Sequence, residues 1–310
     1  MKQIIIGSRG SRLARQQAKL VEQSILSHNP NLVTRIEIIR TSGDTLSQHD
    51  LAHSSESIKG LFVKELEEAL LRGQVDLSVH SLKDLSSELP EGLCLAAIPE
   101  REDPRDVLVA ASPQTSFSDL PPGARLGTGS LRRTVQLRSL REDLSICPVR
   151  GNIDTRIRKM EEKGLDGVVL AAAGLKRLEL QEKISYVFPV QEMIPAVGQG
   201  ALAVEIRSDD ESTRRVVEPL NHRPSQLCTL AERQFLKKMG GGCQLPMGAH
   251  AHVRNGEGIF SAFVASPEPL QLVQKVSHGK AQDLEELALE AADYLLAHGG
   301  DEILRKLDRQ

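Results

Sequence analysis

A cysteine at the end of a glycine run is the most distinctive chemical feature of the sequence. Cys243 directly follows Gly240, Gly241 and Gly242. Glycine has no side chain, so such a loop lets the thiol approach a bulky group closely. The pattern is equally typical of a helix that stops at Met239 and precedes a cysteine packed as a small apolar residue. From these residues alone, a functional thiol and a packed thiol both remain open.

A lysine and an aspartate stand side by side shortly after the expected strand 75–79. In open α/β sheets, ligands bind at the carboxyl ends of the strands. Asp84 could there transfer a proton or stabilise a cation, and Lys83 adds a positive charge. The alternative is an ordinary solvated Lys–Asp pair. His80, which ends the same strand, could act as a base, but a histidine in this place is more often a hydrogen-bonded core residue.

Arginines recur where an expected strand passes into an expected helix. The guanidinium group binds a carboxylate or phosphate through two parallel N–H donors, and helix N-termini favour anions. The residues at these junctions are Arg9, Arg132, Arg133, Arg150, Arg156 and Arg177. Their recurrence in two successive α/β segments predicts an interdomain cleft that binds a molecule with several negative charges. Arg138, Arg141 and Arg158 are adequately explained as parts of solvated helix faces.

The glycine-containing loop 127–130 precedes two of these arginines. It lacks the lysine of a P-loop and the full glycine spacing of a dinucleotide-binding motif. ATP and NAD are therefore not supported, and a backbone nest for an anion is the better interpretation.

The overall composition limits the partners of the chain. Its 39 basic and 42 acidic side chains leave a net charge of −3, and aromatic residues make up only 3%. A basic excess and stacking rings are typical of nucleic-acid binding, which is not expected here. No apolar run approaches the ~20 residues of a membrane span, and no signal peptide fits before Ile4. The four cysteines show no metal-ligand spacing, so we expect a cytoplasmic protein with reduced thiols and no metal site.

Hydrophobic periodicity predicts an α/β protein with three domains. Strands and helices alternate over residues 1–100, which form a first α/β domain completed by about 201–218, and over 101–200, which form a second. Residues 219–310 read as a small α+β domain in which three strands form an antiparallel meander with flanking helices. The expected strands of this meander lie at 250–253, 259–265 and 270–276.

Taken together, the motifs resemble the porphobilinogen deaminase (hydroxymethylbilane synthase) family over nearly the whole chain. Each motif is weak alone, but their order is specific. In this chain they occupy residues 8–14, 59–65, 80–84, 100–106, 127–133, 150–152, 175–177, 195–200 and 241–244. The family is a transferase of tetrapyrrole (heme) biosynthesis. Its two α/β domains resemble periplasmic binding proteins, and its α+β domain carries the cysteine.

The resemblance implies a function and a set of site residues. Four porphobilinogen molecules would be condensed head to tail onto a covalent dipyrromethane primer with release of ammonia, and hydrolysis would give hydroxymethylbilane. Asp84 matches the catalytic aspartate, and Cys243 matches the thioether anchor of the dipyrromethane. The other positions that match cofactor contacts are Lys83, Asp84, Ser130, Arg132, Arg133 and Arg150. Those that match substrate contacts are Arg9, Ser11, Arg150, Arg156 and Arg177.

The resemblance also implies a monomer, with uroporphyrinogen-III synthase as a candidate downstream partner and neither nucleic acid nor membrane as partners. The segment 53–58, where the family is often glycine-rich, reads as a mobile loop over the cleft. Two alternatives concern function. Two α/β lobes could simply capture an anion, which would leave Cys243 without a purpose, or Cys243 could act as a nucleophile in acyl transfer, although no neighbouring histidine in the sequence supports this.

Overall fold

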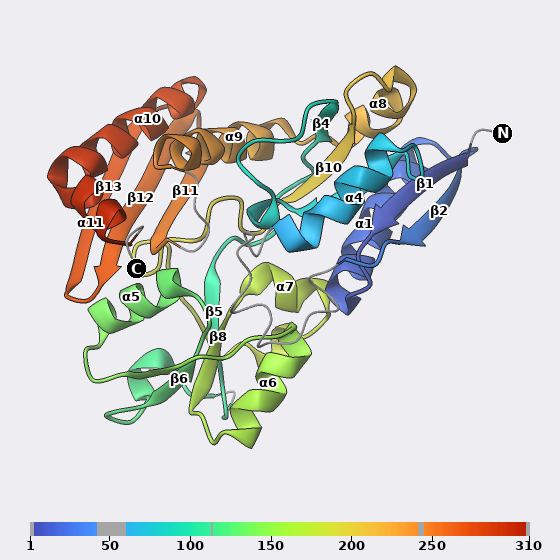
Figure 1. The fold of residues 1–310 in the computed structure, drawn as a ribbon. Helices are drawn as coiled ribbons and strands as arrows, with labels where there is room; N and C mark the ends of the chain where they lie inside the picture. Colours follow the sequence, from blue (N-terminus) through green and yellow to red (C-terminus); the bar gives the residue numbers. More distant parts are fainter. Residues whose placement is uncertain (1–2, 42–59, 113, 241–244, 308–310) are drawn as a thin grey trace. The chain divides into compact units, whose positions relative to one another are not determined.

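A computed structural model describes residues 3–41, 60–112, 114–240 and 245–307 of the chain (Figure 1). Its contacts divide the chain into two compact units, one formed by 1–102 with 201–226 and the other by 103–200 with 227–310. The division into three domains stays a prediction. Within the described ranges, no helix combines the length and the apolar character that crossing a membrane requires.

The first unit is built on a five-stranded sheet in the order β2-β1-β3-β10-β4. The strands are β1 (Gln3–Ser8), β2 (Val33–Ile38), β3 (Leu77–Ser81), β4 (Leu93–Ala97) and β10 (Leu202–Arg207). β1 pairs in parallel with β2 and β3, whereas β10 runs antiparallel to both β3 and β4. The sheet is therefore mixed, because a strand from far along the chain enters between β3 and β4.

Helices cover both faces of this sheet. The helical elements are α1 (Arg12–His28), α4 (Gly60–Leu71), the short 3₁₀ turn η1 (Leu82–Asp84), α8 (Glu211–Val217) and the 3₁₀ turn η4 (Glu218–Leu220). α1 begins at Ser11, whose hydroxyl accepts a hydrogen bond from the Ala14 N–H at 3.2 Å, a standard N-cap. Its apolar face, spaced by three or four residues, packs on the β3 face that carries Leu77 and Val79. α4 packs on the opposite face.

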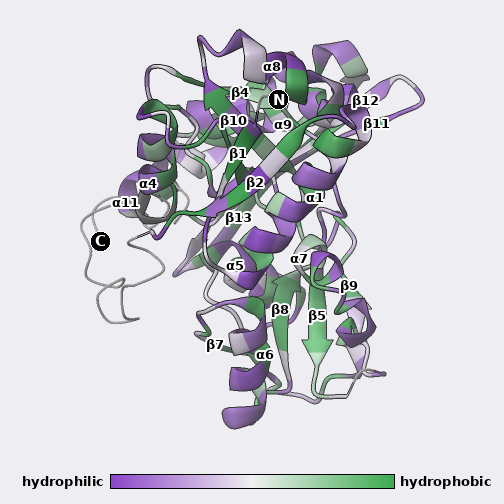
Figure 2. Cartoon of the chain, turned by 90° about the vertical axis from the view of Figure 1, so that its right-hand side faces the viewer, coloured by the Kyte–Doolittle hydropathy of each residue, from purple (hydrophilic) through white to green (hydrophobic). Residues whose placement is uncertain are grey.

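The second unit contains a sheet of the same design, in the order β7-β6-β8-β5-β9. The strands are β5 (Asp106–Ala110), β6 (Arg125–Gly127), β7 (Ser145–Cys147), β8 (Gly167–Ala171) and β9 (Tyr186–Val187). β6 is parallel to β7 and β8, and β5 is antiparallel to β8 and β9. β5 and β8 are almost continuously apolar (Figure 2), as expected of strands covered on both faces. The helical elements are η2 (Phe117–Asp119), α5 (Leu131–Leu140), α6 (Ile153–Glu162), α7 (Ala172–Arg177) and η3 (Gln181–Lys183).

The same unit holds a three-stranded antiparallel sheet, β11-β12-β13. Its elements are α9 (Arg223–Lys238, of which 227–238 belong to this unit), β11 (Met247–Arg254), β12 (Glu257–Pro267), β13 (Leu270–Lys280), η5 (Ala281–Asp283), α10 (Leu284–Leu295), η6 (Leu296–Gly300) and α11 (Asp301–Leu307). One face of this sheet packs with α9 and α10 around a core that includes Phe235 and Phe260 (Figure 1). The predicted meander and the predicted fold class are confirmed.

Candidate active site

In the first unit, the predicted site residues lie at one edge of the sheet. Arg9 and Ser11 follow β1, and Lys83 and Asp84 form the end of η1, which follows β3. β1 and β3 are parallel neighbours, with Gly7 opposite Ser78. Their carboxyl ends therefore meet at the same edge, where open α/β sheets bind ligands. Lys83 and Asp84 are half-buried on this edge.

His80 is a hydrogen-bonded core residue, which is the more common role for a histidine at the end of a buried strand. Its Nε2 lies 3.0 Å from Oε2 of Glu205 on β10, and both side chains are buried. The ring points to the face of the sheet that α4 covers. His80 is therefore a paired core residue of β3, three residues before the Lys83–Asp84 segment.

In the second unit, the predicted residues again gather at the carboxyl ends of parallel strands. Ser130 precedes α5 and follows β6, and its side chain makes no capping hydrogen bond. Arg150 is exposed and follows β7. Arg156 on α6 donates through Nε to the Gly151 carbonyl at 2.6 Å. Arg177, at the end of α7, donates through Nη2 to the Gly200 carbonyl at 2.6 Å.

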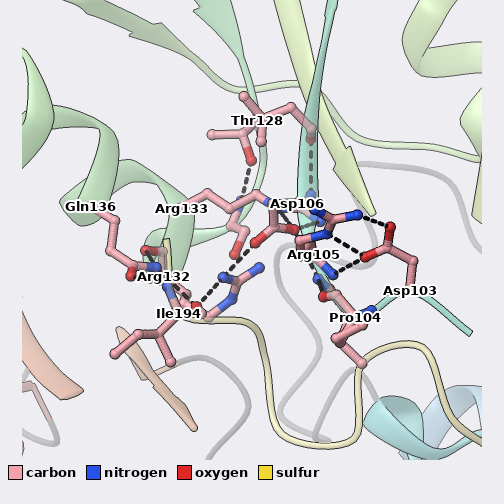
Figure 3. A network of polar contacts seen from close by, with 12 residues as sticks. Asp103, Pro104, Arg105, Asp106, Thr128, Arg132, Arg133, Gln136 and Ile194 are labelled. Atoms are coloured by element: carbon pink, nitrogen blue, oxygen red, sulfur yellow. Dashed lines mark hydrogen bonds and ion pairs between the residues drawn. The ribbon is translucent and has the colours of Figure 1, made fainter. Parts of the chain in front are cut away.

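Arg132 and Arg133 are arranged differently, because both are buried around Asp106 (Figure 3). Arg133 donates to Asp106 Oδ1 through Nη2 at 2.7 Å and Nε at 3.0 Å, and to the Val169 carbonyl. Arg132 Nη1 lies 2.7 Å from Asp106 Oδ2 and 2.6 Å from the Ile194 carbonyl oxygen. The aspartate begins β5, which is antiparallel to β8. The network consequently lies at the same sheet edge as the other site residues of this unit.

The electrostatics of this network leave a positive excess. Burial opposes ionisation of Asp106, but the two guanidinium groups and the hydrogen bonds outweigh it and hold the pKa of Asp106 well below its usual range. Burial also lowers the pKa of Arg133, while Asp106 raises it. Arginine keeps its proton at neutral pH. Two cations therefore share one carboxylate in a buried place, and one positive charge is not balanced within this set.

Asp106 was missed by the reasoning from individual residues, although it ends one of the family motifs. Gln199 was missed as well; its Nε2 donates to Asp106 Oδ1 at 2.9 Å and to the Pro104 carbonyl at 2.7 Å. The available signal for Asp106 was an acid placed directly before the apolar run 107–110. A charge at the start of a buried strand needs a counter-charge, and this requirement points to the neighbouring arginines.

Two predicted features lie outside the described residues. These are Cys243, the expected anchor, and the segment 53–58, the expected loop. The other cysteines, Cys94, Cys147 and Cys228, form no disulfide among the described residues. Among the side chains that the structure describes, no group of three or more potential ligands could hold a metal ion.

Comparison with known proteins identifies the family. The model described as "Porphobilinogen deaminase, dipyromethane cofactor binding domain" matches residues 4–215, and "Porphobilinogen deaminase, C-terminal domain" matches 226–297. This chain belongs to the porphobilinogen deaminase family. It is thus an enzyme, a transferase of tetrapyrrole biosynthesis with a dipyrromethane cofactor, as the motifs predicted.

Full-length relatives agree with this assignment. Porphobilinogen deaminase of Syntrophus aciditrophicus is 46% identical over 303 residues, which cover 98% of each chain. Porphobilinogen deaminase of Roseiflexus sp. is 46% identical over 305 residues, covering 98% of this chain and 99% of the relative. Among solved structures, the methionine-binding protein MetQ matches 75% of this chain and 90% of its own at 12% identity and a TM-score of 0.44.

Proposed function

We propose that the residues gathered at the two sheet edges carry out the stepwise condensation of porphobilinogen, with Asp84 as the catalytic group and Cys243 as the cofactor anchor. The supporting observation is that each unit collects its family-motif residues at the carboxyl ends of its parallel strands. The first unit supplies a carboxylate, a lysine, an arginine and a serine at this edge, and the second supplies a serine and several arginines. Such a set of residues suits a reaction in which cationic side chains bind the carboxylates of the ligands while a carboxylate transfers a proton.

The donor set fits a dipyrromethane, which carries carboxylates. The positive excess of Arg132 and Arg133 over Asp106 favours an anion, and the Ser130 hydroxyl is not used as a helix cap. The side chains that would hold the cofactor are Lys83, Asp84, Ser130, Arg132, Arg133 and Arg150, with a thioether to Cys243. When bound, the dipyrromethane supplies the free α-carbon of a pyrrole as the nucleophile to which porphobilinogen is joined.

Asp84 stabilises the positive charge that develops in each condensation and transfers the proton that the condensation sets free. The C–N bond of the porphobilinogen aminomethyl group breaks, ammonia leaves, and positive charge develops on the methylene and pyrrole nitrogen. An ionised Asp84 carboxylate stabilises that charge. The same carboxylate would accept the proton set free by the condensation and later release it to water or ammonia.

The remaining polar residues orient the substrate. Porphobilinogen carries an acetate and a propionate, which match the two-pronged donors of arginine. Arg9, Ser11, Arg150, Arg156 and Arg177 bind these carboxylates, so they act before and between the bond-forming steps. We further propose that the enzyme works as a cytoplasmic monomer, takes porphobilinogen as its substrate, and delivers its product to uroporphyrinogen-III synthase.

The intact mass of the purified protein tests the anchor. Wild-type enzyme should exceed its sequence mass by one dipyrromethane unit, and Cys243→Ser should lose this excess together with activity. Cys228→Ser, which changes a thiol buried within α9, is the control and should retain the excess. An unmodified mass in a fully active preparation would rule out the covalent cofactor.

A second variant tests the catalytic group. Asp84→Asn keeps the size of the side chain but removes its charge and its capacity to accept a proton. It should retain the cofactor mass and lose about 10²–10⁴-fold in kcat. Near-normal release of ammonia from porphobilinogen would remove Asp84 from this role.

A further inference from the structure

A pair of titratable side chains is buried in the core of the first unit, on the face of the sheet covered by α4. His80 and Glu205 form this pair, with 3.0 Å between Nε2 and Oε2. Ser78 and His80 point to the same face because side chains alternate along a strand. Ser78 lies opposite Glu205 in the pairing of β3 with β10. The other carboxylate oxygen of Glu205, Oε1, is buried and has no hydrogen-bond partner among the described residues.

Glu67, a partly buried carboxylate on α4, is influenced electrostatically by this pair. Burial, and next the Glu205 carboxylate, raise the pKa of Glu67 from 4.5 to about 7, against the opposing effect of His80. Two carboxylates that interact in a partly buried place do not both ionise readily. Glu67 therefore keeps its proton to a higher pH than an exposed glutamate does.

The charged side chains on the elements around His80 and Glu205 lie elsewhere or interact with other residues. On α4, Glu68 pairs with Arg72 at 2.9 Å, and Lys64 and Glu65 make other interactions. On β10, Arg207 is paired with Asp76 and Asp210. β1 brings no titratable side chain, β4 brings only Cys94, and Lys83 and Asp84 follow in η1. His80 and Glu205 thus form a set of two that are paired with each other.

The backbone connects this set to the catalytic turn. β3 ends at Ser81 and η1 begins at Leu82. The Leu82 N–H donates to the Ala201 carbonyl at 3.0 Å, directly before β10, and the Leu85 N–H donates to the Leu82 carbonyl at 3.2 Å. The pairing of β3 with β10 therefore holds the turn that carries Asp84. His80 and Glu205 join these same two strands through their side chains.

We propose that His80 and Glu205 are positioning residues that fasten the end of β3 to β10 and hold Asp84 in its working place. This inference rests on the proposed role of Asp84. Glu205 and His80 provide the fastening. A displacement of about 1 Å at a reacting group can lower a rate by about 10²-fold, so a buried pair can influence turnover without touching substrate.

The first test separates kcat from KM in holoenzyme whose cofactor content is verified by mass. Glu205→Gln retains an oxygen that can accept from His80, whereas Glu205→Leu retains none. We expect kcat of the leucine variant to fall by at least about 10-fold with KM changed less than about two-fold, and the glutamine variant to stay within about three-fold of wild type. Wild-type kcat in folded, loaded Glu205→Leu would overturn the proposal.

Asp84→Asn, assayed in the same series, separates the catalytic role of Asp84 from the positioning role of His80 and Glu205. Normal turnover by Asp84→Asn would remove the proposed function of Asp84, and with it the reason for positioning. An inactive Asp84→Asn together with a fully active Glu205→Leu would leave Asp84 in its role and refute only the positioning role of His80 and Glu205.

Discussion

Replacement of Asp106 by asparagine should destabilise the second unit strongly. The carboxylate accepts from Arg133 at 2.7 and 3.0 Å, from Gln199 at 2.9 Å, and is paired with Arg132 at 2.7 Å. Both arginines are only 5% exposed, so Asp106→Asn leaves two buried cations without a counter-charge. Removing one partner of a buried ion pair costs about 3–5 kcal/mol. At roughly 2–4 °C per kcal/mol, this corresponds to a fall in Tm of about 10 °C.

Urea unfolding followed by circular dichroism measures this loss, in samples matched for cofactor content by mass. The control is Glu162→Gln, which breaks an exposed pair with Arg158 on α6 and should cost at most about 0.5 kcal/mol. A free-energy loss for Asp106→Asn below about 1 kcal/mol, or equal to that of the control, would refute the account of the buried network.

The pH dependence of the same pair of proteins provides an independent check. The folded state holds the pKa of Asp106 below its unfolded value of 3.8. The stabilisation is therefore present above that value and is lost as the pH falls, because the folded state resists taking up a proton that the unfolded state accepts. The gap in stability between wild type and Asp106→Asn should narrow as the pH drops below about 4. A gap that widens there would contradict the sign of the effect.

Three further expectations follow. Glu67 should lower the free energy of unfolding as the pH rises from 4.5 to about 7, because the folded chain keeps a proton on Glu67 that the unfolded chain loses. Thermal unfolding should show this contribution as roughly 1–2 kcal/mol in the wild type, and Glu67→Gln should lack it. Gly127→Ala should cost about 1–3 kcal/mol in chemical denaturation, because a methyl group there would meet two valine carbons at 2.8 Å. Gly10→Ala, where the nearest atom is 3.7 Å away, serves as its control. Finally, Arg150→Ala and Arg156→Ala should lower the turnover of porphobilinogen or the loading of the cofactor, while Tm changes little. Unchanged steady-state activity would show that neither arginine binds substrate or cofactor.

Local patterns carried much of the fold. The helix periodicity after Ser11, the continuous apolar strand 167–171 and the Asn255–Gly256 turn each predict their element from neighbouring residues, and the structure contains all three. These features depend on interactions within a few positions of the chain, which is why sequence reasoning reaches them. The ordered motifs likewise identified the family, and the comparisons bear this out.

The partners of the buried charges could not be read in the same way. Arg132 and Arg133 were expected to face a ligand as free anion-binding groups, yet both guanidinium groups contact Asp106. The sequence predicts that His80 lies at the end of a strand, which in the structure extends one residue further to Ser81, but its partner Glu205 lies 125 residues away. The energy of a buried charge depends on which groups surround it in space, and spacing along the chain does not specify those groups.

The sequence by itself therefore determined the chemical types available to this enzyme: a carboxylate after one strand, arginines after several others, and a thiol after glycines. Only the tertiary structure decided which of these side chains are already paired. It inserted β10 between β3 and β4, which brought Glu205 to His80, and it set Asp106 beside two arginines. Long-range strand pairing decides such contacts, because it joins segments whose local patterns carry no information about each other.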